Sequence, residues 1–249
     1  MNILITTMGT TWAVVPELFG FTNPAQYPLY EHHPNAAMFK EWREEFTIKP
    51  VDAVWVVTTN GERVLPQREL LTDWAKTLGI EVRQISTGGL RELASVEECQ
   101  LMGDLICRTV LTAHNQAERV YLSLAGGRKT MSADLQLAAG WFGCDALLHV
   151  VDSGQLAPEL RTPKVTDLLD ALPAEVIKAI SPLVVSARIR RSSLLAVKPA
   201  ITVHEFPLDK GVDTPTLLME MQRRQKDAGA LLSNYRHSLV ESEQSNFRS

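Results

Sequence analysis

Five short apolar segments recur along the first 151 residues, and they constrain the fold more than any other feature. They occupy residues 2–7, 52–59, 80–86, 119–125 and 145–151, and β-branched residues are common in them. Strands that are apolar along nearly their whole length are typical of a parallel sheet with both faces covered. Each segment therefore predicts a buried strand.

Helical patterns lie between these predicted strands. Apolar residues recur at helical spacing in residues 62–79, 95–114 and 130–143. The second of these segments opens with Ser95 and Glu98, the spacing of a capping box. Strands that alternate with helices predict an α/β fold of the Rossmann-like, doubly wound type, with a mostly parallel sheet and right-handed crossovers.

The connection after the first strand departs from this alternation. Prolines at positions 24, 28 and 34 interrupt a helical pattern with a loop of about ten residues, which is long for such a connection. The loop carries His32 and His33. We weigh two interpretations, a solvated loop and a segment that gates a pocket.

After residue 151 the alternation fades, and we divide the chain into a domain over 1–151 and a C-terminal extension over 152–249. The extension reads as a linker at 151–165, a short helix broken near Pro173, a late strand at 199–207 and a long amphipathic helix at 214–243. The expected fold class is thus a Rossmann-like sheet with a small C-terminal α/β extension.

Composition excludes several classes of function. The net charge of -4 argues against a broad surface for duplex nucleic acid. The first residues form an apolar run without a basic leader, too short for a membrane span, so we expect a cytoplasmic protein. Histidine, cysteine and acidic residues nowhere show metal-ligand spacing, so we expect no metal and no cofactor.

The loops that follow four of the predicted strands are rich in Gly, Thr, Ser and Asn. They read TTMGTTW at 6–12, TTNGE at 58–62, STGGLRE at 86–92 and AGGRKTMS at 125–132. The carboxyl ends of parallel strands share one edge of a sheet, where ligands bind. Backbone N–H groups in such turns and at helix N-termini bind anions. The convergence of the four loops predicts a site for a phosphorylated ligand.

The fourth loop differs from the common phosphate-binding motifs. It does not match the P-loop pattern, and no strand leads into G-x-G-x-x-G. The carboxylate that would complete a nucleotide-hydrolysis or dinucleotide site is also missing from the expected positions. ATP hydrolysis and NAD chemistry are therefore disfavoured.

The segment SLAGGRKTM at 123–131, together with TTMGTTWAVVPE at 6–17, resembles the CARF domain, the CRISPR-associated Rossmann-like sensor of cyclic oligoadenylate. The resemblance covers residues 1–151. Family members carry Gly-Gly-x-Lys at the start of this helix, here Gly126 to Lys129, with Arg128 where threonine is common. The resemblance implies a homodimer whose two-fold axis passes through the bound ring. Some members only sense the ring, whereas others, the ring nucleases, cleave it.

For this chain we expect cyclic tetra-adenylate as the favoured ligand and metal-independent cleavage by a ribose 2′-OH, which ends type III CRISPR signalling. Such cleavage needs positioning and charge stabilisation. Lys129 would supply charge, Arg128 a clamp, and Thr10 or Thr11 an orienting hydroxyl; these four are the candidate catalytic residues. The expected ligand-binding residues are Thr7, Met8, Gly9, Thr10, Thr11, Thr59, Asn60, Thr87, Gly88, Ala125, Gly126, Gly127, Arg128, Lys129, Thr130 and Met131.

Purely structural roles remain open for several of these residues. Gly126 and Gly127 can simply form a turn, and Arg128 can be a surface or dimer-pairing residue. Asn60 and Thr87 are favoured as turn formers. A separate residue, Trp12, is expected to pack in the core or an interface, with adenine stacking as the alternative.

A second class of function is a sensor that does not cleave and acts through its C-terminal segment on DNA or a protein partner. Arg108 and His114 have the spacing of a ribonuclease motif, which we attribute to chance because they fall inside the predicted sensor domain. Acidic residues interrupt the basic face of the helix at 214–243, which favours a dimer-stabilising or capping helix.

Overall fold

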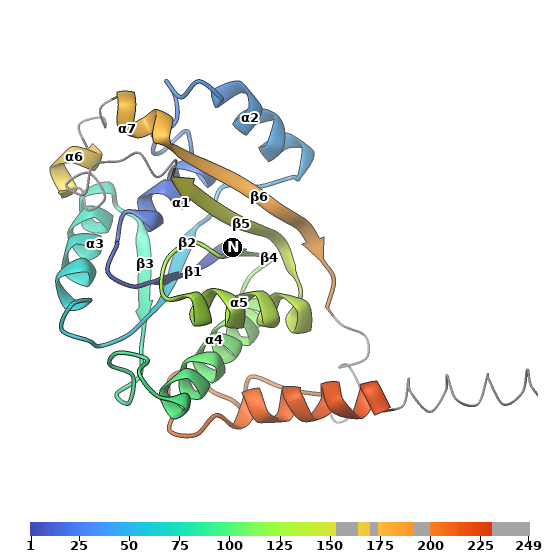
Figure 1. The fold of residues 1–249 in the computed structure, drawn as a ribbon. Helices are drawn as coiled ribbons and strands as arrows, with labels where there is room; N and C mark the ends of the chain where they lie inside the picture. Colours follow the sequence, from blue (N-terminus) through green and yellow to red (C-terminus); the bar gives the residue numbers. More distant parts are fainter. Residues whose placement is uncertain (153–163, 170–173, 192–199, 231–249) are drawn as a thin grey trace, which may run out of the picture.

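Figure 1 shows a central sheet with helices packed on both faces. The structure is a computed structural model that describes residues 1–152, 164–169, 174–191 and 200–230. The strands are β1 (Asn2–Met8), β2 (Ala53–Thr58), β3 (Glu81–Ile85), β4 (Arg119–Ser123), β5 (Cys144–Asp152) and β6 (Ile180–Ile189). The helices are α1 (Val14–Thr22), α2 (Ala36–Glu45), α3 (Leu65–Leu78), α4 (Val96–Gln116), α5 (Lys129–Phe142), α6 (Val165–Leu169) and α7 (Ala174–Ala179), followed by a helix over 216–230.

The strand order is β3-β2-β1-β4-β5-β6, in which the first five strands are parallel and β6 runs antiparallel to β5. The predicted Rossmann-like α/β fold is therefore confirmed. The order reverses between β1 and β4, because the chain moves outward from β1 to β3 and then returns to the other side of β1. This topological switch point is where open α/β sheets bind ligands.

Alternate residues of the central strands enter two separate cores. Ile3 and Ile5 of β1 pack with α4, α5 and the helix over 216–230, whereas Leu4 packs with α1 and α3 on the opposite face. All six residues of β2 are buried. Burial on both faces is why these strands are apolar throughout.

The first crossover contains two helices, α1 and α2, joined by the segment with three prolines. In this segment Tyr27, Tyr30 and His33 are buried, while His32 is exposed. The His33 ring lies 4.7 Å from the Phe39 ring of α2, and its Nδ1 accepts a hydrogen bond from the backbone of Asn35. The interpretation as a solvated loop therefore holds for the exposed residues of this segment, whereas its buried aromatic residues complete the core.

The extension over 152–249 differs from its prediction in two places. Strand β6 was not predicted, and the strand predicted at 199–207 does not form, since residues 200–207 adopt coil and turns. Ile201 and Leu208 instead bury their side chains in the core on the α4 side of the sheet. This segment lies against helices rather than beside a strand, so among the described residues it has no strand partner for backbone hydrogen bonds. The predicted linker falls largely outside the described residues, as does the predicted helix beyond residue 230. The division into 1–151 and 152–249 stays a prediction.

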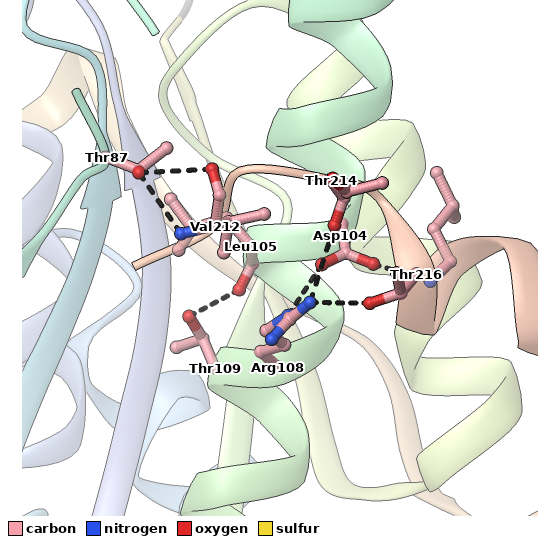
Figure 2. Close-up of polar contacts among 9 residues, drawn as sticks. Thr87, Asp104, Leu105, Arg108, Thr109, Val212, Thr214 and Thr216 are labelled. Atoms are coloured by element: carbon pink, nitrogen blue, oxygen red, sulfur yellow. Dashed lines mark hydrogen bonds and ion pairs between the residues drawn. The ribbon is translucent and has the colours of Figure 1, made fainter. Parts of the chain in front are cut away.

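A buried ion pair attaches the C-terminal segment to α4 (Figure 2). Asp104 is fully buried and accepts hydrogen bonds from Nε of Arg108, at 2.6 Å, and from the backbone N–H of Leu218, at 2.7 Å. Arg108 also donates to the hydroxyl of Thr216, at 2.8 Å, and its guanidinium lies over the ring of Phe206. Arg108 therefore has a structural role, which agrees with attributing its ribonuclease-like spacing to chance.

Candidate functional site

The candidate site is the sheet edge formed by the carboxyl ends of β1 and β4, at the switch point of the sheet. Parallel pairing places Thr6 of β1 opposite Ser123 of β4, so the loops that follow these two strands are neighbours. The hydroxyl of Thr6 donates to the carbonyl of Ala125 and that of Thr7 to the carbonyl of Gly126, both at 3.0 Å. The two predicted motifs are thus hydrogen-bonded to each other.

Gly126 and Gly127 form a turn that only glycine fits. Both have left-handed backbones, with φ of 86° and 67°. A Cβ on Gly126 would collide with the carbonyl oxygen of Thr7, and one on Gly127 would lie 2.8 Å from the Thr7 hydroxyl oxygen. A Cβ on Gly9 would lie 3.3 Å from Cα of Gly127. The turn after β4 is therefore folded closely onto the end of β1.

This turn delivers the first residues of α5 to the switch point. Arg128 has an extended backbone and Lys129 is the first helical residue. The backbone N–H of Arg128 donates to Sδ of Met131, at 3.4 Å, and the hydroxyl of Ser132 donates to the carbonyl of Leu124, at 2.9 Å. A helix N-terminus that carries exposed cations favours a bound anion, because the helix dipole opposes cations placed there alone.

The predicted ligand-binding residues fall into three groups by exposure. The exposed group comprises Thr10, Thr11, Gly88, Gly127, Arg128, Lys129 and Thr130; the partly exposed group comprises Gly9, Asn60 and Gly126; the buried group comprises Thr7, Met8, Thr59, Thr87, Ala125 and Met131. The four candidate catalytic side chains are all exposed. The side chains of the buried group pack beneath the loops and are not accessible at the surface.

Asn60 and Thr87 organise the loops after β2 and β3. The amide of Asn60 donates to the carbonyl of Thr87, at 3.0 Å, while its oxygen accepts from Arg68, at 2.6 Å, and Ser86, at 2.9 Å. The Thr87 hydroxyl exchanges hydrogen bonds of 3.3 Å with the backbone of Val212 in the C-terminal segment. These contacts are those of turn formers. Thr87 also joins a predicted ligand loop directly to the extension (Figure 2).

Trp12 follows the exposed threonines and is fully buried. Its ring centroid lies 6.4 Å from that of Trp74 on α3. Trp12 thus packs in the core, as expected, and its burial leaves no ring face at the surface for stacking.

Glu92, in the loop after β3, is a residue of this edge that sequence reasoning missed. Its Oε2 lies 3.3 Å from a terminal nitrogen of Arg128. Only the presence of a carboxylate in STGGLRE hinted at it, because the contact joins positions that are distant along the chain.

Among the described residues, no group of three or more histidine, cysteine or acidic side chains is arranged to hold a metal ion. Over the same residues, no helix has the length and apolar character needed to cross a membrane.

Fold and site together define a Rossmann-like α/β protein with a basic, glycine-lined edge at its topological switch point. The family model described as CRISPR-associated protein NE0113 (Cas_NE0113) matches residues 45–226. The match covers most of the chain, including β4 and the start of α5, and the protein belongs to this CRISPR-associated family. The predicted membership of a CRISPR-associated family is therefore confirmed.

Comparisons with individual proteins add less to the assignment than the family model does. No curated protein matches the sequence. Among solved structures, one described as Enterococcus italicus Csm6 bound to cyclic hexa-2′-fluoro-hexa-dAMP matches with a TM-score of 0.41 and 10% sequence identity. The match covers 74% of this chain and 41% of the Csm6 chain, so this chain spans about two fifths of that protein.

Proposed function

We propose that the protein binds a cyclic oligoadenylate, with cyclic tetra-adenylate favoured, at the edge formed by the loops after β1 and β4. The observation that carries this proposal is the Gly126–Gly127 turn, which places Arg128 and Lys129 at the switch point of the sheet. Membership of a CRISPR-associated family supports a ligand from that system. The ligand would lie across a homodimer in the cytoplasm, with residues 1–151 as the ligand-binding domain.

We further propose that the protein cleaves the ring without a metal ion. A ribose 2′-OH attacks the adjacent phosphorus and loses its proton, the 5′-oxygen leaves and gains one, and the products end in 2′,3′-cyclic phosphates. The nucleophile belongs to the ligand, so the protein has to hold it in line and stabilise the charge that develops on phosphorus.

The exposed side chains at this edge have the chemistry for that task. The Lys129 ammonium is an immediate source of positive charge for the phosphorane oxygens, and the Arg128 guanidinium can contact two phosphate oxygens at once. Thr10 and Thr11 carry exposed hydroxyls in the neighbouring loop after β1. Backbone N–H groups of the Gly126–Gly127 turn would add donors to the same phosphate.

The test is incubation of the purified protein with cyclic tetra-adenylate and, separately, cyclic hexa-adenylate, in EDTA, with products separated by chromatography. Wild-type protein is expected to give linear products, and Lys129→Ala to lose most of the rate while still binding the ring. Intact rings bound tightly by the wild type would refute cleavage. An absence of binding to either ring would refute the whole proposal.

One observation favours a second candidate, a sensor that does not cleave. The hydrogen bonds between Thr87 and Val212 join a loop of the ligand edge to the segment that leads into the helix over 216–230. A ligand that moved this loop would move that segment too. The same incubation separates the candidates, because a sensor leaves the ring intact.

A further inference from the structure

The ion pair between Arg128 and Glu92 lies in the open at the ligand edge. The side chains of Arg128 and Glu92 are 58% and 47% exposed. The pair joins the loop after β3 to the turn after β4, so the cation that we assign to the ligand phosphate already holds a carboxylate of the same chain. The proposed phosphate site therefore already contains a negative charge that belongs to the protein, the Glu92 carboxylate.

The loop that carries Glu92 is held in place on both sides. Leu90 and Leu93 are buried, and Leu93 has a left-handed backbone with φ of 52°, a conformation that is unfavourable for a non-glycine residue. The Glu98 carboxylate accepts from the backbone N–H groups of Arg91, at 3.3 Å, and Ala94, at 2.6 Å. Glu92 is therefore presented from an anchored loop.

Gly61, in the loop after β2, lies close to the Glu92 carboxylate. A Cβ at this position would lie 2.6 Å from Oε1 of Glu92 and 2.5 Å from the carbonyl oxygen of Arg91. The backbone carbonyl of Arg91 is the contact that requires glycine at this position. The side chain of Glu92 thus packs on the loop after β2 while its other oxygen faces Arg128.

We propose that Glu92 is a specificity-determining residue that competes with the ligand phosphate for Arg128. This inference rests on the proposed function. A phosphate that takes the guanidinium must displace the carboxylate and tolerate its negative charge nearby. A ligand with several phosphates, which also uses the glycine turn and Lys129, offsets that cost, whereas a small anion that contacts Arg128 alone is rejected. Glu92 therefore lowers affinity and raises selectivity.

The size of the effect follows from the exposure of the pair. An exposed ion pair changes an equilibrium constant by up to about fivefold, and removal of the nearby negative charge adds to this. Glu92→Gln keeps the shape of the side chain and is expected to tighten binding of cyclic tetra-adenylate about three- to tenfold. Because salt screens exposed charges, the gain should shrink between 50 mM and 500 mM NaCl.

The experiment measures dissociation constants of labelled cyclic tetra-adenylate for the full-length protein and three single variants, Glu92→Gln, Arg128→Gln and Glu69→Gln. Glu69 is exposed on α3, beside the hollow between α3 and β3, and its substitution changes the net charge equally. The double variant Glu92→Gln/Arg128→Gln completes a cycle. We expect tighter binding for Glu92→Gln, no change for Glu69→Gln, and an effect of Glu92→Gln below about twofold once Arg128 is absent.

Unchanged or weaker binding by Glu92→Gln, with normal binding by the wild type, would overturn this inference alone; weaker binding would mean that Glu92 orients Arg128 for the ligand. An equal gain from Glu69→Gln, or a full gain without Arg128, would overturn it as well. If the wild type binds no cyclic oligoadenylate, the proposed function fails first and the inference with it. Inorganic phosphate at millimolar concentration should compete better in Glu92→Gln than in wild type, a readout that a merely structural role would not move.

Discussion

The buried pair between Asp104 and Arg108 should carry a large part of the stability of the C-terminal segment. Asp104→Asn keeps the size of the side chain and an oxygen for the Leu218 N–H, but it leaves the Arg108 charge without its partner. Breaking one side of a buried pair costs about 3–5 kcal/mol. We expect about 3 kcal/mol, the low end, because the hydroxyl of Thr216 and the ring of Phe206 still contact the guanidinium.

Two assays distinguish a loss of global stability from local undocking of the C-terminal segment. Urea unfolding at pH 7 reports the free energy of unfolding, and limited trypsin digestion reports undocking, because Arg223, Arg224 and Lys226 lie in the helix over 216–230. Undocking alone would accelerate cleavage at these sites while the urea midpoint moves little. A shift below about 1 kcal/mol together with an unchanged trypsin rate would refute the reasoning.

The double variant Asp104→Leu/Arg108→Met is the matched control. It removes both charges and replaces them with apolar groups, which is often neutral or stabilising for a buried pair. It should recover at least half of the stability that Asp104→Leu alone loses. If the double variant is as unstable as the single one, the loss comes from packing rather than from an uncompensated charge.

Three further predictions concern the turn, the site and pH. Gly126→Ala should lower stability by about 1–3 kcal/mol and abolish ring binding, measured by thermal melts and titration, because it forces a side chain into a left-handed backbone against Thr7; Gly140→Ala, with open space around it in α5, should raise stability by about 0.5–1 kcal/mol. Arg128→Gln should weaken binding of cyclic tetra-adenylate and reduce its salt dependence, measured by titration at several NaCl concentrations. Burial raises the pKa of Glu17 from 4.5 to about 7, and the Asp152 carboxylate adds to the rise. Because the folded protein then retains a proton that the unfolded chain releases, the free energy of unfolding should fall by up to about 3 kcal/mol as pH rises from 4.5 through 7. Glu17→Gln should remove most of that fall, measured by urea unfolding between pH 5 and pH 8. Asp134, whose pKa burial raises to about 6, should leave a smaller fall in the same direction.

The central parallel strands could be predicted because burial on both faces gives them a continuous apolar run. The edge strand β3, predicted as buried, instead alternates exposed and partly buried residues up to Ile85. The predicted segments 2–7 and 119–125 correspond to β1 and β4, which lie at the centre of the sheet. Strand β6 is an edge strand with many partly exposed residues, and it contains Pro182 and a positive φ at Arg188. Its sequence therefore lacks the continuous apolar run, and only the pairing with β5 defines it.

The contacts that sequence reasoning missed join residues from different loops or elements. Asp104 and Arg108 have the i,i+4 spacing of a helix ion pair, but their burial depends on a segment about 110 residues further along the chain. Glu92 and Arg128 are 36 residues apart and meet because two loops share a sheet edge. Spacing along the chain shows which residues share a helix face, but not which loop lies against which.

The two interpretations of the glycine turn, structural and ligand-binding, describe one geometry. Gly126 and Gly127 are required because the turn lies against Thr7, and that same closeness brings the first residues of α5 to the switch point. A glycine substitution would therefore impair folding and binding together and could not tell the two roles apart. Lys129 is exposed, and its side chain is not needed for the turn, so loss of cleavage in a stably folded Lys129→Ala protein would bear on chemistry alone. The test of the functional proposal therefore depends on Lys129 and Arg128 rather than on the glycines that made the motif recognisable.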